Sequence, residues 1–126
     1  MIASQIKSFI HEYIEAISGK EKTPALIEKF VVDPELKEHI AFFEAAFPKY
    51  ELIVDDYIFE DDKAVIRARG KGVHKGQLMN IPPTGKSIEV PLVAIYQVKN
   101  DKIVKNWLFF DRMLMMEQLG VMSSDN

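Results

Sequence analysis

The sequence predicts an α+β fold, with helices in the first half of the chain and an antiparallel sheet in the second half. Up to residue 47, apolar residues recur at steps of three and four, the period of an amphipathic helix. From residue 50 onward, β-branched residues become frequent and the period shortens, which is typical of strands. A length of 126 residues suits one domain. We expect this domain to span residues 1–122, followed by a flexible tail over residues 123–126.

Three helices are predicted before the sheet. The first ends at Ser18-Gly19, since glycine accepts the backbone conformation that stops a helix. The second starts at Thr23-Pro24 and the third at Asp33-Pro34, because each pair places a capping side chain before a proline at the first helical position. Pro48 ends the third helix. The apolar stripe of the first helix consists of Ile2, Ile6, Phe9, Ile10, Tyr13, Ile14 and Ile17.

Four strands and a closing helix are predicted in the second half. A four-residue turn over residues 60–63 joins the first two strands, and Asn100-Asp101 joins the last two. Pro82-Pro83-Thr84-Gly85 forms another turn, in which glycine takes the positive φ. The closing helix ends at Gly120. The strands are expected at residues 51–59, 64–74, 87–98 and 103–110, and the helix at residues 112–119.

Composition and motifs exclude several classes of function. The 16 Lys and Arg residues against 19 Asp and Glu give a net charge of −3, so no attraction to nucleic acid or to an anionic membrane is expected. The absence of cysteine removes disulfides, thiol nucleophiles and thiolate metal sites. Without a signal-peptide pattern or an apolar run of membrane length, a cytoplasmic protein is expected. Phosphate-binding and dinucleotide-binding motifs are missing, so we expect no cofactor.

Asp111 is the first candidate for chemistry. It follows an apolar strand end and precedes a methionine-rich helix, surroundings that would raise its pKa and suit it to proton transfer. The alternative is that Asp111 caps the closing helix, in which case it would be a poorer base. The apolar residues around it, among them Trp107 and Phe109, are either core, a pocket wall or a subunit contact.

The three histidines differ in their sequence surroundings. His11 faces away from the apolar stripe of its helix and lacks the second histidine that a zinc site on a helix requires, so we expect no metal there. His39 borders the buried face of the third helix, where it is either structural or part of a pocket. His74 closes a strand and is either a catalytic loop-edge residue or an ordinary surface residue.

Several segments of the second half together resemble the SnoaL-like polyketide cyclase family, also called ester cyclases, of the NTF2-like superfamily. The resemblance covers about half of the chain in close order, with the stretch from Phe42 to Pro48 extending it upstream. Where the family commonly has Glu-His before the tryptophan, this chain has Lys105-Asn106. The segments are Gly72-Val73-His74-Lys75-Gly76, Ile81-Pro82-Pro83-Thr84-Gly85-Lys86, Lys102-Ile103-Val104-Lys105-Asn106-Trp107, Asp111 and Gln118-Leu119-Gly120.

The resemblance implies a cone, in which a curved sheet wraps around an apolar cavity and the long first helix forms the other wall. It also implies homodimers that pair through the sheet. The founding cyclases close a ring by a cofactor-free intramolecular aldol condensation, with an aspartate at the position of Asp111 as acid and base. On this pattern, Trp107 and Tyr13 line the cavity, and His74 or His39 polarises a substrate oxygen.

Two functional hypotheses follow from the sequence. The first is an enzyme that performs cofactor-free acid/base chemistry, an aldol-type cyclisation or an isomerisation, on a carbonyl-activated hydrophobic molecule. Its catalytic residues would be Asp111 and His74, and its substrate contacts Tyr13, His39, Trp107 and Phe109. The second is a non-catalytic domain of the same fold that binds a hydrophobic ligand or a protein partner. The surroundings of Asp111 distinguish the two, since the enzyme needs this carboxylate inside the cavity.

Overall fold

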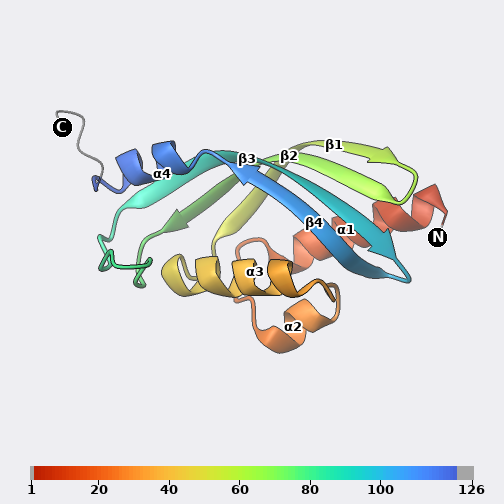
Figure 1. The fold of residues 1–126 in the computed structure, drawn as a ribbon, viewed down its shortest axis with the longest axis horizontal. Coiled ribbons are helices and arrows are strands. Elements are labelled where there is room, and N and C mark those ends of the chain that lie inside the picture. The colour runs from red at the N-terminus through yellow and green to blue at the C-terminus, as the bar shows by residue number, and fades with distance from the viewer. Residues whose placement is uncertain (1, 122–126) are drawn as a thin grey trace.

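The computed structural model describes residues 2–121 and confirms the α+β fold class. Three helices precede a sheet of four strands, and a short helix follows it (Figure 1). The tail expected at residues 123–126 lies outside the described residues. The elements are α1 (Ala3–Ile17), α2 (Pro24–Glu28), α3 (Pro34–Ala46), β1 (Glu51–Glu60), β2 (Lys63–Val73), β3 (Ser87–Lys99), β4 (Lys102–Phe110) and α4 (Arg112–Gln118).

The helix boundaries follow the predicted capping residues. The Thr23 Oγ1 atom accepts a hydrogen bond of 3.2 Å from the Leu26 amide, and Asp33 accepts one of 3.2 Å from the Glu35 amide. Gly19, at φ 71°, lies just after α1, where few residues with a side chain would be accepted. These predicted starts and stops are therefore confirmed.

The sheet is an antiparallel meander in the order β1-β2-β3-β4. The hairpin between β1 and β2 is tighter than predicted, because Glu60 pairs with Lys63 and only two residues form the turn. Asn100 and Asp101 both have positive φ, at 52° and 58°, which matches the type I′ turn that suits the twist of two paired strands. The register shifts between Val54 and Asp56 in β1 mark an irregularity of the kind that bends strands.

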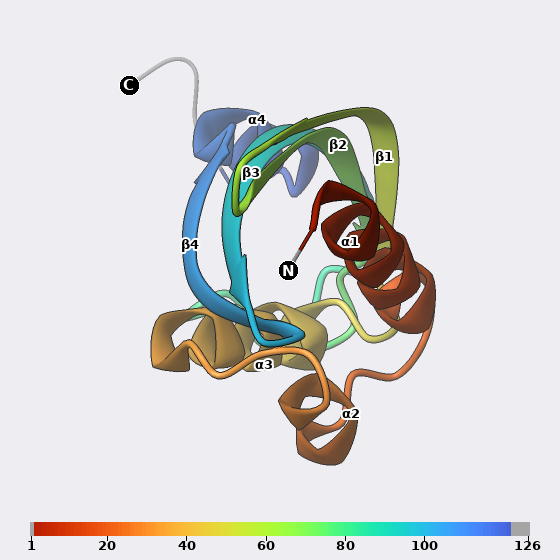
Figure 2. The same cartoon turned by 90° about the vertical axis from the view of Figure 1, so that its right-hand side faces the viewer.

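The curved sheet arches over α1 and α3, which lie on its concave side (Figure 2). The buried face of α1 is the predicted apolar stripe without Ile2, which is exposed. This face packs against inward residues of the strands, such as Ile66 and Ala94, in the larger of two hydrophobic clusters. No helix within residues 2–121 is long and apolar enough to cross a membrane.

A second hydrophobic cluster ties the loop between β2 and β3 to the end of α3. The Ala46 carbonyl accepts hydrogen bonds from the amides of Lys75, at 3.1 Å, and Gly76, at 3.0 Å. Any side chain at Gly76 would overlap the Ala45 carbonyl, so this close approach requires glycine. Leu78 from the loop and Met115 from α4 are both buried in this cluster. The loop is therefore docked on the body of the fold.

Candidate functional site

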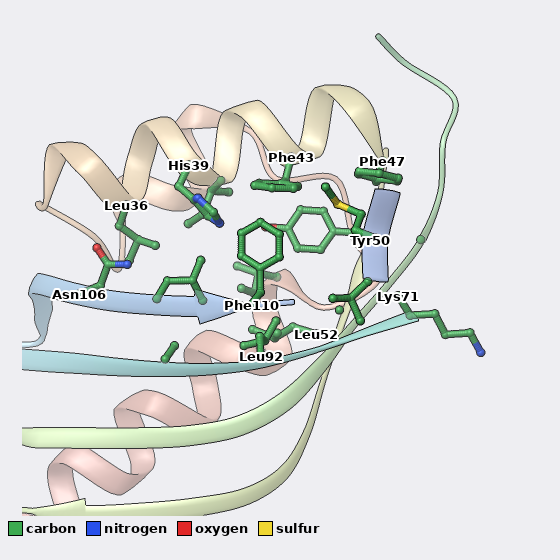
Figure 3. A pocket seen from close by; sticks show the side chains of 18 of the residues that line it. Leu36, His39, Phe43, Phe47, Tyr50, Leu52, Lys71, Leu92, Asn106 and Phe110 are labelled. Carbon is green, nitrogen blue, oxygen red and sulfur yellow. The ribbon is translucent and has the colours of Figure 1, made fainter. Parts of the chain in front are cut away.

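An apolar cavity of about 90 Å³ lies between the concave face of the sheet and α3 (Figure 3). In Figure 3, His39, Phe43 and Phe47 approach it from the helix side, while Leu92 and Phe110 approach it from the strands. The expected wall, α1, contributes Tyr13 and Ile17, so α3 supplies more of the helical lining than α1 does. Among the described residues that line the cavity there is no carboxylate.

The alternation of β3 and β4 decides which strand residues reach the cavity. Successive side chains of a strand point to opposite faces of the sheet. In β4 the inward residues are Asn106, Leu108 and Phe110, which pair in register with Tyr96, Ala94 and Leu92 of β3. All six line the cavity.

Three tyrosines are among the residues that line the cavity. Tyr13 and Tyr96 are buried, with ring centroids 5.7 Å apart in an edge-to-face arrangement. Burial, together with the neighbouring tyrosine Tyr96, raises the pKa of Tyr13 well above its ordinary value. Burial likewise raises the pKa values of Tyr50 and Tyr96. All three are therefore neutral hydroxyl groups at physiological pH, able to donate hydrogen bonds.

Tyr50 is held from behind by a buried lysine. The Lys22 ammonium group lies 3.9 Å from the centre of the Tyr50 ring and donates to the Tyr50 carbonyl at 2.8 Å. It also donates to the Lys20 carbonyl at 2.8 Å and to Glu44 Oε1 at 3.2 Å. Burial lowers the pKa of Lys22, and the Glu44 carboxylate opposes that shift. This cluster joins the loop after α1, the end of α3 and the start of β1 behind the cavity.

His39 projects from α3 toward β4 in Figure 3. Its ring lies 4.6 Å from that of Phe43 and 6.4 Å from that of Phe110, measured between centroids. Burial among these apolar groups lowers its pKa, so the neutral imidazole dominates at pH 7. The sequence left two alternatives for His39, a structural role and a place in a pocket. In the structure His39 lines the cavity.

Asp111 lies outside the cavity lining and caps α4. Its Oδ1 atom accepts a hydrogen bond of 2.9 Å from the Leu114 amide, and its side chain is exposed. The capping alternative is therefore confirmed. The Asp111 carboxylate therefore lacks the enclosed, apolar surroundings that were expected to suit it to proton transfer.

His74 is fully buried, at 0% exposure, but it too lies outside the cavity lining. Its Nδ1 atom accepts a hydrogen bond from the Thr84 amide at 3.2 Å and lies 3.0 Å from Thr84 Oγ1. The ring packs 5.3 Å from that of Phe47. The alternative of an ordinary surface residue is therefore wrong, and His74 fastens the loop between β2 and β3. The catalytic role expected for His74 stays a prediction.

Trp107 and Phe109 lie on the outer face of the sheet, because they alternate with the inward residues of β4. Phe109 is 67% exposed, and the Lys105 ammonium group lies 4.9 Å from the Trp107 ring centre. Neither side chain lines this cavity, and their expected contacts with substrate stay predictions from the sequence. Of the predicted substrate contacts, only Tyr13 and His39 reach the cavity.

A model of the SnoaL-like polyketide cyclase family matches residues 31–119, more than half of the chain. The chain belongs to the SnoaL-like polyketide cyclase family. No curated protein matches it.

Solved structures similar to this SnoaL-like protein show the same fold at low identity. AclR from Streptomyces galilaeus, a candidate hydroxylase, has a TM-score of 0.82 and 19% identity over 98% of this chain and 85% of its own. TsrD from Streptomyces laurentii has a TM-score of 0.77 and 20% identity over 97% and 99%. A hypothetical protein from Catenulispora acidiphila with a ketosteroid isomerase-like fold has a TM-score of 0.69 and 15% identity over 90% and 93%.

Sequence reasoning missed several cavity residues of this SnoaL-like protein. They are Phe43 of α3, Phe47 and Tyr50 in the segment between α3 and β1, and Asn106 of β4. For Asn106 the signal was available, because strand alternation places it opposite to Trp107. Within the described part of the chain, no group of three or more histidine and acidic side chains is placed to hold a metal ion.

Proposed function

We propose that this protein is an enzyme that performs cofactor-free acid/base chemistry on a carbonyl-activated, hydrophobic small molecule. The observation that carries the proposal is the cavity, whose lining is almost entirely apolar yet contains a few polar groups. Such a site suits a ligand that is mostly hydrocarbon and carries one or two oxygen atoms. Membership in the SnoaL-like polyketide cyclase family supports a cyclisation or an isomerisation of this kind.

The chemistry needs a group that removes a proton from the carbon beside a carbonyl, and donors that stabilise the enolate oxygen. Exclusion of water strengthens both interactions, because the local dielectric constant falls. The neutral tyrosine hydroxyls are suitable donors. Asp111, the acid/base that the family resemblance implies, is not among the residues that line the cavity, and its cap bond from the Leu114 amide stabilises α4 by about 1 kcal/mol.

A small ketone tests this proposal. We expect the protein to accelerate exchange of the α-protons of cyclohexanone for deuterium, followed by proton NMR in D₂O. Leu92→Phe, which narrows the cavity, should slow the exchange, while Ile58→Phe on the outer face of β1, at 58% exposure, should leave it unchanged. Equal exchange in both variants would contradict catalysis in this cavity.

A second candidate function is a non-catalytic domain that binds a hydrophobic ligand or a protein partner. The absence of a carboxylate from the described lining favours it, since the family's acid/base is an aspartate. Binding of cyclohexanone without any proton exchange would support this alternative.

The outer face of the sheet supports a homodimer. Phe109 is 67% exposed and Val93, its register partner on β3, is 40% exposed, while Trp107 and Ile95 form the neighbouring pair. Such an apolar group on a surface is typical of subunit contacts. Sedimentation should show a dimer that Phe109→Asp converts to a monomer, whereas Met79→Asp, in the loop between β2 and β3 and 57% exposed, should leave the dimer intact. A cytoplasmic location, and the lack of nucleic-acid and membrane partners, remain predictions from the sequence.

A further inference from the structure

We propose that His39 is the proton-transfer residue of the cavity and that the Asn106 amide donates to the carbonyl oxygen of the substrate. This assignment rests on the proposed function and names the two residues that would perform it. It differs from the pattern implied by the family resemblance, in which the aspartate at position 111 moves the proton.

The other candidate bases lie elsewhere. His11 is exposed on α1, with its ring 4.4 Å from that of Tyr57, and His74 uses Nδ1 to accept from the Thr84 amide. Asp111 caps α4 outside the cavity. Because the described lining has no carboxylate, His39 is the one described lining residue that is an ordinary base near neutral pH.

The geometry leaves the His39 ring free to act. Among residues 2–121, neither ring nitrogen forms a hydrogen bond, and neither is a fully buried atom without a partner. Phe43 and Phe110 contact the ring and restrict its orientation. Burial lowers the pKa of His39, so at pH 7 the imidazole is neutral and able to accept a proton.

The groups that face His39 do not compete for that proton. Apart from Lys71, the titratable side chains that line the cavity with His39 are Tyr13 of α1, Tyr50 just before β1 and Tyr96 of β3, and burial raises their pKa values. Lys71 of β2 extends away from the cavity in Figure 3. On α3 itself, Glu35 and Glu38 are exposed. A proton taken up by His39 therefore stays on the imidazole until the reaction returns it.

Asn106 supplies the matching donor from the opposite wall. It projects from β4 toward Leu36 of α3, at the same end of the cavity as His39 (Figure 3). Within the described residues its side-chain amide makes no hydrogen bond, although it lines an apolar cavity. An amide N–H in such surroundings stabilises a developing oxyanion more strongly than it would in water.

The reaction step balances with these two residues. The imidazole of His39 accepts the α-proton, the carbon–hydrogen bond breaks, and its electron pair forms the carbon–carbon double bond of an enolate. The negative charge moves to the carbonyl oxygen, which accepts a hydrogen bond from Asn106. The imidazolium then returns the proton, either to carbon in an isomerisation or to the new alkoxide after the enolate carbon attacks a second carbonyl.

The test compares deuterium exchange of cyclohexanone in the wild type, His39→Gln, Asn106→Leu and the control His11→Gln. General base catalysis contributes about 10²- to 10⁴-fold, so His39→Gln should lose at least about 100-fold. Asn106→Leu should lose about 10²-fold, as removal of one oxyanion donor does, without moving the acidic limb of the pH profile. His11→Gln should match the wild type.

A second variant guards against misfolding. Exchange by His39→Ala should recover when imidazole is added, whereas a merely structural role would give no recovery. Full exchange by a folded His39→Gln variant, or loss of exchange in Asp111→Asn alone, would overturn the assignment while leaving the proposed function intact. A wild-type protein that binds cyclohexanone but does not exchange its protons would overturn the proposed function itself.

Discussion

Replacing Lys22 by methionine should destabilise the protein by about 2 kcal/mol. The Lys22 side chain is 0% exposed and makes three hydrogen bonds, to the carbonyls of Lys20 and Tyr50 and to Glu44. Methionine keeps the length and the apolar stem of lysine but removes the ammonium group. The loss is therefore confined to polar interactions.

The magnitude comes from three contributions. Hydrogen bonds from a charged group contribute about 1.5 kcal/mol net each, and the contact with the Tyr50 ring adds about 1 kcal/mol. Burying the ammonium group costs several kcal/mol, taken here as about 3.5, a cost that methionine avoids. Two acceptors keep other partners, since the Tyr50 carbonyl also accepts from Gly19 and Glu44 accepts from the Lys49 amide. Only the Lys20 carbonyl loses its one described partner.

Urea denaturation followed by circular dichroism measures this change. Glu44→Gln should cost less, about 1 kcal/mol, because glutamine still accepts from Lys22. The double variant should be less destabilised than the sum of the single variants, since the two side chains interact directly. A Lys22→Met protein within about 0.5 kcal/mol of the wild type would refute the reasoning, because exposed substitutions away from such contacts change stability by that amount.

Three further predictions concern the cap, the loop and the imidazole. Asp111→Ala should lower the free energy of unfolding by about 1 kcal/mol and Asp111→Asn by much less, since asparagine is also a good N-cap; equal losses in urea melts would contradict this. Gly76→Ala should reduce the thermal midpoint more than Gly85→Ala, because an added side chain at Gly76 overlaps the Ala45 carbonyl. At Gly85 the added side chain meets open space, and only the φ of 73° is unfavourable. The reverse order of midpoints would contradict the docking of the loop. As the pH falls from 7.5 through 6.5, the wild type should lose stability relative to His39→Gln, because His39 takes up a proton in the unfolded chain but, with its lowered pKa, stays neutral in the folded protein. An equal change of the two urea midpoints between these pH values would contradict this.

Local signals predicted the fold well. Thr23, Asp33 and Asp111 cap helices because a short side chain with an oxygen atom, placed just before a helix, accepts a hydrogen bond from an amide of the first turn. This pattern can be predicted from neighbouring residues alone. The turn between β1 and β2 was predicted too long, since the strands continue to pair up to Glu60 and Lys63. Pairing at the end of a strand depends on the partner strand, which local sequence does not reveal.

The cavity was harder to predict, because it depends on packing between distant parts of the chain. The aromatic run around Trp107 was assigned to the pocket as a group, although a strand sends neighbouring side chains to opposite faces. His74 precedes a segment that contains glycines and two prolines and is typical of a surface loop, yet this segment folds back and buries His74 completely. The apolar period of its helix placed His39 at the border of the buried face, but which strand residues it would meet depends on how α3 packs against the sheet.

The alternation of β4 also makes this protein a convenient scaffold for engineering. Inward residues such as Asn106 and Leu108 and outward residues such as Trp107 and Phe109 occupy one continuous strand. A library that varies only residues 106, 108 and 110 would alter the shape and polarity of the chamber while leaving the outer surface as it is. The complementary library at residues 107 and 109 would change the outer surface, where a subunit contact is proposed, and would leave the chamber as it is. New selectivity and new assembly could thus be selected separately and combined afterwards.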